Sequence, residues 1–397
     1  MIRAYLFSPR LIKNIEYTQG GSSNRNLLDL YLPIEGKNRK VSNQKPVIIF
    51  LCGGAWIIGY KMWSFFVCQG LADLGILCVV PDYRNFPQGN ADDMLMDVNN
   101  AIKWTVSNIH KYNGDPSCIT IGGQSAGAHL AMTLLALWYK DISKNDQNSS
   151  PLSSYDNSPS KLNDSLDFLA IDDDNNIPAD ALFTWKTSPK SEVTNKRVDD
   201  SCGNSSKFDY ADLSRIKLFI GISGPYNLPV LKNVLHQKGL DSSIFNYIFN
   251  DDIDKYSPVS IFGGILNEMK NNNSGRNVIK FPKVALFHGS CDKSVPLTSS
   301  LELVDVLKKI DITADCNVYE GWSHTDAILE GPMSCGGKCP SEYRFFQDMS
   351  KYIYATYDDC DVGNKLFTND IVKASIDEVS ISNNNILIHI ARFCNPF

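Results

Sequence analysis

Ile119-Thr120-Ile121-Gly122-Gly123-Gln124-Ser125-Ala126-Gly127-Ala128-His129-Leu130 is the stretch that decides the fold. β-Branched residues lead into it, residues 123–127 match the pattern G-x-S-x-G, and strong helix formers follow. Between a strand and a helix, this pattern indicates a nucleophile elbow, a tight turn that presents a reactive serine at the end of a strand. The residues beside Ser125 must be small for the turn to close. The alternative is an ordinary glycine-rich turn.

Strands and helices alternate on both sides of this stretch. The strand expected at 46–52 is apolar throughout, as in a sheet that is covered on both faces. Alternation with right-handed crossovers predicts an α/β fold, specifically a mostly parallel, doubly wound sheet. We expect the other strands at 27–32, 76–82, 216–223, 282–289 and 314–320, and helices at 64–75, 91–109, 301–310 and 341–355.

The whole chain, 1–397, is predicted to form one domain with two special regions. Asn, Ser, Asp, Lys and Pro dominate residues 141–207, which hold too little apolar surface to offset the entropy of ordering them. We interpret this segment as a low-complexity, disordered insertion within the domain. Residues 225–280 mix helix and loop, and we expect them to form a lid over the site.

Net charge and hydropathy argue against nucleic-acid binding, membrane-spanning segments and secretion. A net charge of −6 gives no reason to expect nucleic acid as a partner. No apolar run reaches transmembrane length, and the first 13 residues are too short and too basic for a secretory signal. These features favour a cytoplasmic protein.

The eleven cysteines suit reduced thiols better than a disulfide framework, because several lie inside apolar runs. Cys335 and Cys339 form a close pair, but no second pair or histidine follows at zinc-finger spacing. Cys394 lies four residues from the end, where a prenylated cysteine would stand. We expect it to be unmodified, because Asn395 is polar and Pro396 restricts the chain.

A serine nucleophile needs a base, and the base needs a carboxylate that orients it. In hydrolases with the elbow, these residues follow the serine in the order acid, then histidine. Asp292 and His324 each come just after a predicted strand, at the edge of the sheet where α/β proteins place catalytic groups. The sequence therefore predicts Ser125 as nucleophile, Asp292 as acid and His324 as base.

Other residues compete for these roles. Asp326 is the rival acid, but it stands too close in sequence to His324 to reach the far ring nitrogen. Asp292 could instead be a turn residue before Pro296. The remaining histidines lie within helices, strands or the tail, at positions 110, 129, 236, 288 and 389.

The oxygen of the attacked carbonyl develops negative charge and needs fixed hydrogen-bond donors, a site called the oxyanion hole. Gly54 and Ala55 follow the buried strand at 46–52, and Ala126 follows the nucleophile. We predict that the backbone amides of these three residues form the oxyanion hole. Two neighbouring glycines alone would equally fit a strand-end turn.

Several further residues can be explained by structural roles. Asp82 and Arg84 are expected to form a structural ion pair rather than bind substrate. Four aromatic residues after the predicted oxyanion loop could line an acyl pocket or belong to the core: Trp56, Trp63, Phe65 and Phe66.

The chain resembles the esterase branch of the α/β-hydrolase superfamily and, within it, the prenylcysteine (isoprenylcysteine) α-carboxyl methylesterases. Cys52 stands where many esterases have histidine, and the methylesterase subgroup also lacks that histidine. The resemblance covers most of residues 26–348 outside the insertion and rests on the runs at 53–61, 82–89, 123–129, 219–228, 286–289 and 324–326.

This resemblance implies a serine carboxylesterase that hydrolyses the methyl ester of a C-terminal prenylcysteine without metal or organic cofactor. Its partner would be an ester substrate, either a small molecule or a lipidated protein. The enzyme would reach this substrate while bound peripherally to endoplasmic reticulum or Golgi membrane. An arylformamidase or a broad carboxylesterase or lipase is the alternative enzyme. A catalytically silent binding protein with the same fold is the alternative of another class.

Overall fold

The structure is a computed structural model. It describes residues 2–18, 23–34, 44–148, 208–237, 243–271, 280–334 and 343–360. The account below concerns the compact unit formed by residues 1–148 and 210–397. Most of the predicted insertion, the close pair Cys335 and Cys339, and the tail with Cys394 lie outside the described residues.

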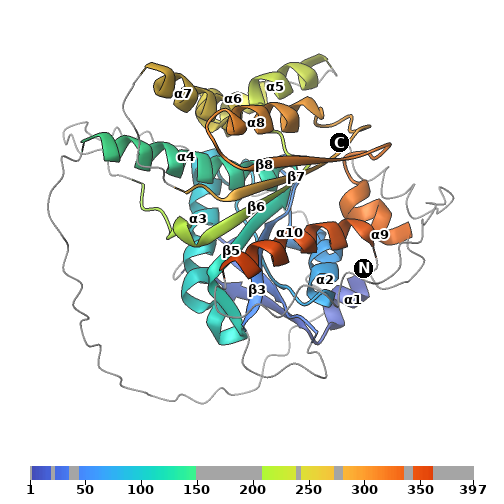
Figure 1. The fold of residues 1–397 in the computed structure, drawn as a ribbon. Helices are drawn as coiled ribbons and strands as arrows, with labels where there is room; N and C mark the ends of the chain where they lie inside the picture. Colours follow the sequence, from blue (N-terminus) through green and yellow to red (C-terminus); the bar gives the residue numbers. More distant parts are fainter. Residues whose placement is uncertain are drawn as a thin grey trace, which may run out of the picture. The chain divides into compact units, whose positions relative to one another are not determined.

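The described residues form an eight-stranded sheet in the order β1-β2-β4-β3-β5-β6-β7-β8 (Figure 1). The two pairs β1·β2 and β2·β4 are antiparallel, and every pair from β4 to β8 is parallel. The predicted mostly parallel sheet is thus confirmed. Its strands are β1 (Leu11–Glu16), β2 (Leu27–Tyr31), β3 (Lys45–Leu51), β4 (Leu77–Pro81), β5 (Gly114–Gln124), β6 (Ile216–Ile222), β7 (Lys283–Gly289) and β8 (Ala314–Tyr319).

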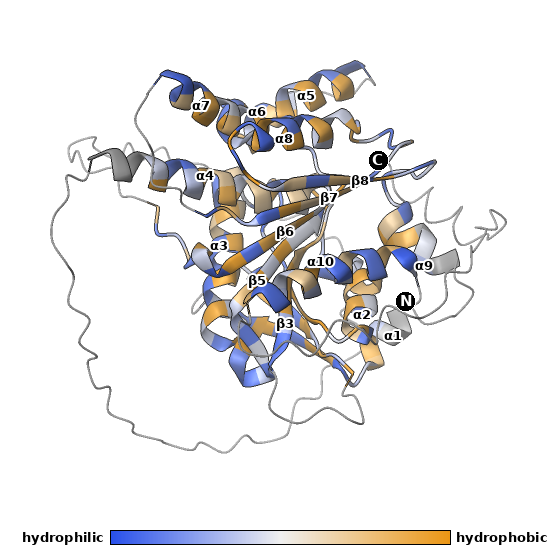
Figure 2. Cartoon of the chain, in the orientation of Figure 1, coloured by the Kyte–Doolittle hydropathy of each residue, from blue (hydrophilic) through white to orange (hydrophobic). Residues whose placement is uncertain are grey.

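Helices cover both faces of the sheet. α2 (Phe65–Asp73) and α10 (Arg344–Cys360) pack on one face, and α3 (Ala91–Asn108) and α4 (Ala126–Asn148) pack on the other (Figure 1). Hydrophobic residues dominate the central strands, whereas the helices carry both hydrophobic and hydrophilic residues (Figure 2). Residues 47–51 of β3 are at most 1% exposed, which agrees with the double-sided burial predicted from their apolar run.

The predicted lid region contains α5 (Leu228–Gln237), α6 (Ser243–Ile248), the 3₁₀ turn η5 (Asp254–Tyr256) and α7 (Pro258–Asn271). α7 packs against α4 and against α8 (Thr298–Lys308). The remaining short helices are α1 (Ile2–Phe7), η1 (Lys61–Ser64), η2 (Ile109–Tyr112), η4 (Leu213–Arg215), η6 (Asp326–Glu330) and α9 (Gly331–Ser334).

Several elements differ from expectation, among them the following three. β1 was not predicted, because Asn14 adopts a left-handed φ of 61° and a register shift between Ile12 and Ile15 breaks the alternation of the strand. β5 begins at Gly114, five residues before the stretch quoted above, and Gly114 pairs with Lys45 of β3. α4 continues to Asn148, so the first eight residues of the predicted insertion, 141–148, are helical.

No helix among the described residues is long and apolar enough to cross a membrane. The seven cysteines in this part of the chain are free thiols, and those at positions 52, 68, 78 and 118 are buried.

Candidate active site

Ser125 stands in a strained turn between β5 and α4. Its φ of 51° lies in the left-handed region, which side chains rarely adopt, and its backbone is held by a 2.8 Å hydrogen bond to the carbonyl of Ile222. A Cβ atom on Gly127 would lie 2.3 Å from the carbonyl oxygen of Leu51, and one on Gly123 would lie 2.7 Å from the same atom. Both glycines are therefore required for the close packing of the elbow against β3.

The register of the parallel strands brings the predicted site residues to one edge of the sheet. Leu51 at the end of β3 pairs with Gly123, so the loop after β3 lies beside the elbow. Gly289 at the end of β7 pairs with Tyr319 at the end of β8, so the loops with Asp292 and His324 also meet.

Asp292 and His324 are in direct contact. Nδ1 of His324 donates a hydrogen bond to Oδ2 of Asp292 at 2.7 Å. Oδ1 of Asp292 accepts from the backbone amides of Ser294 and Val295, both at 2.9 Å. Burial alone raises the pKa of Asp292, but the hydrogen bonds from His288 and His324 outweigh it and hold the pKa well below its usual range. Asp292 is therefore a fixed anion that orients the imidazole.

The other ring nitrogen of His324 faces Gln124, the residue before the serine. The side-chain amide of Gln124 donates to Nε2 of His324 at 3.2 Å, and Ser125 and His324 are both less than 9% exposed. In this arrangement of the described residues, Oγ of Ser125 forms no hydrogen bond with the ring. The bond from Gln124 leaves Nε2 unprotonated, as a base requires, and must break before the ring can take the proton of Ser125.

Sequence reasoning missed His288, which shares the carboxylate of Asp292. Nε2 of His288 lies 3.2 Å from Oδ2 of Asp292 and 3.0 Å from the carbonyl oxygen of Val295. Nδ1 of His288 lies 2.8 Å from Oγ of Ser300, which can donate to it. The only available signal was the spacing of four residues between His288 and Asp292, across a turn whose geometry no local pattern reveals.

The predicted oxyanion loop has an unusual backbone. Gly54, Ala55 and Trp56 have φ values of 136°, 49° and 64°, all in the left-handed region. A Cβ on Gly54 would lie 2.2 Å from the nitrogen of Gly59, so only glycine fits there. Ala126, the third predicted donor, is the first residue of α4, where backbone amides have no partner within the helix. The three amides thus lie on two segments that meet beside Ser125.

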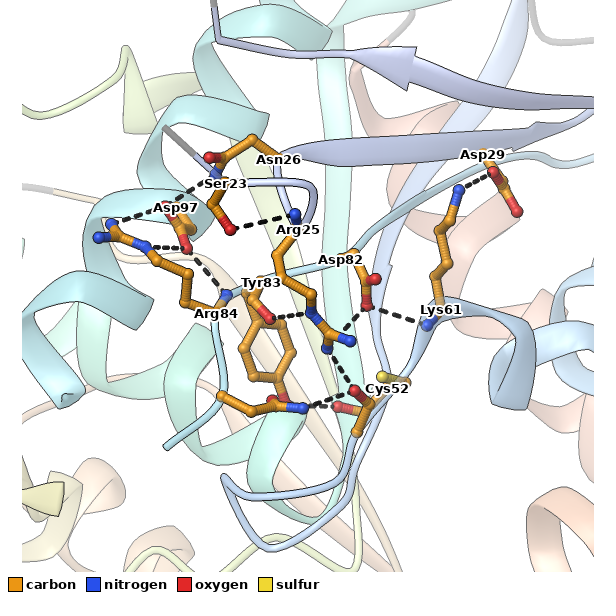
Figure 3. A network of polar contacts seen from close by, with 12 residues as sticks. Ser23, Arg25, Asn26, Asp29, Cys52, Lys61, Asp82, Tyr83, Arg84 and Asp97 are labelled. Atoms are coloured by element: carbon orange, nitrogen blue, oxygen red, sulfur yellow. Dashed lines mark hydrogen bonds and ion pairs between the residues drawn. The ribbon is translucent and has the colours of Figure 1, made fainter. Parts of the chain in front are cut away.

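A polar network anchors the loop at residues 52–61 (Figure 3). The guanidinium of Arg25 donates to the carbonyl oxygens of Gly59 and Tyr83. The hydroxyl of Tyr83 donates to the carbonyl of Cys52 at 2.8 Å. These bonds fix both ends of the loop from outside the sheet.

Asp82 and Arg84 do form structural ion pairs, but the prediction that they pair with each other is wrong. Asp82 lies 3.2 Å from Arg25, and Arg84 binds Asp97 at 2.9 Å (Figure 3). Arg84 also binds Asp93 at 2.8 Å. Burial raises the pKa of Asp82 to about 7, and the charge of Arg25 opposes this shift.

The competing residues take other roles. The carboxylate of Asp326 accepts from the amide of Ser323 at 2.6 Å. Trp56 and Phe65 are buried in the core, at 4% and 5% exposure, and Phe66 packs against it. Trp63 is 44% exposed and lines a small cavity.

That cavity has a volume of about 30 Å³ and adjoins the oxyanion loop. The hydroxyl of Ser64 is buried there without a hydrogen-bond partner among the described residues. Its walls are formed by Phe50, Cys52, Gly53, Trp63, Ser64, Val67, Gln124 and Ile328.

A hydroxyl at a strained elbow, a neutral imidazole and a buried carboxylate are the groups that acyl transfer needs. Within the part of the chain that the structure describes, no cluster of three His, Cys, Asp or Glu residues is arranged to hold a metal ion.

Comparison with known proteins agrees with this assignment of fold. A model of the protein family described as BD-FAE matches residues 28–196. Esterase B of Lactobacillus rhamnosis superposes with a TM-score of 0.58 at 14% identity and covers 88% of each chain. A truncated carbohydrate esterase from gut microbiota gives a TM-score of 0.51 at 18% identity, covering 88% of this chain and 96% of the other. These likenesses establish the α/β-hydrolase fold.

Similar sequences extend over most of the chain. A probable isoprenylcysteine alpha-carbonyl methylesterase of Oryza sativa subsp. japonica is 32% identical over 335 residues, which are 84% of this chain and 61% of that protein. The isoprenylcysteine alpha-carbonyl methylesterase of Arabidopsis thaliana is 31% identical over 358 residues, 90% and 65% of the two chains. A second Oryza protein with the probable methylesterase name is 30% identical over 363 residues, 91% and 67%. The chain thus spans about two thirds or less of the length of these relatives.

Proposed function

This chain belongs to the family of the isoprenylcysteine alpha-carbonyl methylesterases, and we propose that it is a serine carboxylesterase. The observation that supports the proposal most is the 2.7 Å hydrogen bond between His324 and the buried Asp292, at the same sheet edge as the strained Ser125. Ser125 is the proposed nucleophile, His324 the base and Asp292 the residue that orients it.

The first half of the reaction forms an acyl-enzyme. Nε2 of His324 takes the hydroxyl proton of Ser125 while Oγ attacks the ester carbonyl carbon. The amides of Gly54, Ala55 and Ala126 stabilise the negative oxygen of the tetrahedral intermediate. His324 then returns its proton to the departing alkoxide, so a methyl ester releases methanol.

The second half frees the enzyme. A water molecule loses a proton to Nε2 of His324 and attacks the acyl carbon. The second tetrahedral intermediate collapses with Oγ of Ser125 as the leaving group, and His324 protonates it. The products are a carboxylic acid and the original hydroxyl. Asp292 stays ionised throughout, because its pKa lies well below the usual range.

We propose the methyl ester of a C-terminal prenylcysteine as the substrate class, carried by a lipidated protein or a small molecule. The names of the relatives support this choice, since they are described as isoprenylcysteine alpha-carbonyl methylesterases. A broader carboxylesterase is the second candidate, because an esterase of Mycobacterium tuberculosis is 38% identical over 119 residues of this chain.

The nucleophile is tested by Ser125→Ala, with Ser117→Ala as the matched control at an exposed position of the same strand. Loss of a triad serine typically lowers kcat about a million-fold. We expect Ser125→Ala to abolish ester hydrolysis with an unchanged melting temperature and Ser117→Ala to match the wild type. A folded Ser125→Ala protein that keeps more than a small fraction of activity contradicts the assignment.

The substrate is tested by comparing kcat/KM for N-acetyl-S-farnesylcysteine methyl ester with that for a short-chain aryl ester and N-formylkynurenine. We expect the prenylcysteine ester to be preferred. Preference for the aryl ester favours the broad carboxylesterase, and preference for the formamide favours an arylformamidase. Wild-type protein that binds these compounds but hydrolyses none indicates the silent binding protein.

We also propose that the protein works in the cytoplasm, in peripheral contact with the endoplasmic reticulum or Golgi membrane. The free, buried thiols of the described residues support a reducing compartment. Cell fractionation with protease protection tests this: a protein protected inside a lumenal fraction contradicts the proposal.

A further inference from the structure

The proposed oxyanion hole is assembled from two segments that are separate in the sequence. Gly54 and Ala55 belong to the loop after β3, and Ala126 belongs to the elbow. Donors stabilise a developing charge only if their positions are fixed before the reaction. Something must therefore hold the loop at a constant distance from the elbow, although three consecutive residues of the loop have left-handed backbones.

Trp56, the residue after Ala55, is the side chain that crosses from the loop to the elbow. It is 4% exposed, and its ring meets those of His129, Phe245 and Phe249 edge-on, with centroids 5.2 to 5.9 Å apart. Its carbonyl accepts a 2.8 Å hydrogen bond from the amide of Phe86. Trp56 is thus fixed both by its backbone and by its ring.

The indole N–H of Trp56 donates to Nδ1 of His129 at 3.2 Å. The other nitrogen, Nε2, donates to the carbonyl oxygen of Tyr256 at 2.8 Å. An indole nitrogen can only donate and a carbonyl oxygen can only accept, so both partners require the same neutral tautomer of His129. His129 is fully buried, and burial lowers its pKa to about 4, which keeps the ring uncharged at neutral pH.

His129 lies one helical turn after the nucleophile. Its backbone amide donates to the carbonyl of Ser125 at 3.0 Å, so its position is tied to that of the elbow. Its side chain reaches Tyr256, which ends η5 in the segment that was predicted to form a lid. The imidazole therefore joins the elbow, the oxyanion loop and the 243–256 segment through two hydrogen bonds.

We propose that His129 is a positioning residue that acts through Trp56 to hold the amides of Gly54 and Ala55 at the distance from Ala126 that the oxyanion requires. This role rests on the proposed function, because it concerns the same site. His129 contacts neither the substrate nor the reacting atoms. Its effect falls on the transition state, in which the oxygen is charged, and little on the bound ester, in which it is not.

Two kinds of substitution separate the two hydrogen bonds. Trp56→Phe keeps a smaller aromatic ring and removes the indole N–H. His129→Leu removes both bonds, whereas His129→Asn retains an acceptor at the place of Nδ1 and loses the donor to Tyr256. Thr133→Val is the matched control, one turn further along α4. The hydroxyl of Thr133 donates to the same carbonyl of Tyr256 at 3.1 Å and lies 3.3 Å from Nε2 of His129. Trp104→Phe on α3 controls for a tryptophan replacement elsewhere.

The measurements are kcat and KM for 4-nitrophenyl acetate and Ki for a 1,1,1-trifluoro-2-alkanone, which adds reversibly to the serine and places an oxyanion in the hole. Titration with a phosphonate gives the concentration of reactive Ser125 in each protein. We expect Trp56→Phe and His129→Leu to lower kcat and weaken ketone binding by about tenfold, less than the hundred- to thousand-fold typical of losing an oxyanion donor itself. KM should change by less than about twofold, as expected for an interaction made in the transition state.

His129→Asn should retain most of the kcat of the wild type. The controls Thr133→Val and Trp104→Phe should have the kcat and Ki of the wild type even if they lower the melting temperature. The proposal is overturned if His129→Leu and Trp56→Phe keep wild-type kcat and Ki, or if His129→Asn or Thr133→Val loses as much as His129→Leu. If the wild-type protein hydrolyses the ester and the variants give one of these overturning results, only the positioning role of His129 is contradicted. Wild-type protein that hydrolyses no ester contradicts the proposed function beneath it.

Discussion

At the scale of single residues, one carboxylate oxygen, Oδ2 of Asp292, contacts two histidine side chains. Oδ2 of Asp292 accepts from His324 at 2.7 Å and lies 3.2 Å from Nε2 of His288. The hydroxyl of Ser300 can donate to the other nitrogen of His288, which leaves the proton on Nε2. Ser300, His288 and Asp292 therefore form a directed chain of hydrogen bonds that ends on the carboxylate.

We predict that His288→Leu lowers kcat about tenfold, because hydrogen bonds to charged groups contribute roughly 1.5–3 kcal/mol. His288→Gln should retain most of the activity, since its amide nitrogen can donate from the place of Nε2. Steady-state kinetics from pH 5 to pH 9 provide the measurement, and Ser300→Ala, which leaves the donor to Asp292 intact, is the control. Equal losses in the Gln and Leu variants would show that packing matters and the donor does not.

The second prediction at this scale concerns pH. Burial lowers the pKa of His129 to about 4 in the folded protein, against an ordinary value of about 6.5 in the unfolded chain. Between these values the unfolded chain binds more protons, so stability falls as the pH falls from about 6.5 to about 4. From pH 7.5 to pH 5 the cost is about 2 kcal/mol.

Urea denaturation at both pH values measures this cost. His129→Asn should lose about 2 kcal/mol less than the wild type between them, because it lacks the titrating group. The raised pKa of Asp82 acts with the opposite sign in this range, but it is present in both proteins and cancels in the comparison. Parallel losses in the two proteins would mean that His129 does not titrate as inferred.

Chain order predicted Asp292 and His324, the two residues that the structure brings into contact. It did not predict His288 or His129 as parts of the site. Their partners are set by a turn geometry in one case and by a loop 73 residues away in the other, and neither leaves a periodic pattern in the sequence. The catalytic roles themselves stay predictions until the variants are measured.

At the scale of elements, the elbow depends on how closely α4 approaches β3. Gly127 lies against the backbone oxygens of the last residue of β3 and the residue after it, since a Cβ there would be 2.3 Å from the oxygen of Leu51 and 2.5 Å from that of Cys52. Backbone atoms in a paired strand cannot move aside as a side chain can. The approach of helix to strand, and with it the position of Ser125, therefore depends on this glycine.

We predict that Gly127→Ala destabilises the protein by about 3 kcal/mol or more, the upper range for overpacking. Gly264 in α7 is the matched control, because a Cβ there has no atom within 4 Å. Gly264→Ala should stabilise the fold by roughly 0.5–1 kcal/mol, as expected for alanine in a helix. Urea denaturation measures both, and a stable Gly127→Ala protein would show that the elbow can relax.

The structures of β3 and β1 explain why one strand could be predicted from the sequence and the other could not. Residues 47–51 are continuously apolar and proved to be a strand buried on both faces. β1 alternates imperfectly, because Asn14 turns the chain and lets its amide donate to the buried carboxylate of Asp29 at 2.9 Å. A strand whose register breaks to satisfy a distant carboxylate lacks the period on which prediction relies.

At the scale of the whole molecule, the predicted insertion interrupts the chain between α4 and β6. The chain re-enters the described fold at two fixed contacts. The hydroxyl of Tyr210 donates to Asp141 of α4 at 2.8 Å, and the amide of Ala211 donates to Asn99 of α3 at 2.7 Å. We propose that the residues between 148 and 208 are dispensable for the fold, because both of their flanks are held without them.

We predict that replacing residues 149–207 by a six-residue Gly/Ser linker leaves kcat/KM within about twofold of the wild type. Asn148 lies seven residues beyond Asp141, about 10 Å along the helix. Six extended residues span about 20 Å, enough for the return to Tyr210. Shortening a 59-residue connection also lowers the entropic cost of closing it, by up to about 2 kcal/mol. The melting temperature should therefore stay the same or rise.

The first residue that is removed determines whether the deletion also shortens α4. A deletion that begins at Ser143 also removes a buried residue and the last six residues of α4, so it should melt lower than the deletion that begins at residue 149. Kinetics and thermal melting of the two deletions separate the loss of helix from the loss of the insertion. If the deletion of 149–207 folds and melts like the wild type but loses more than about tenfold in kcat/KM, the insertion contributes to the site, because loop closure alone costs far too little to explain such a loss.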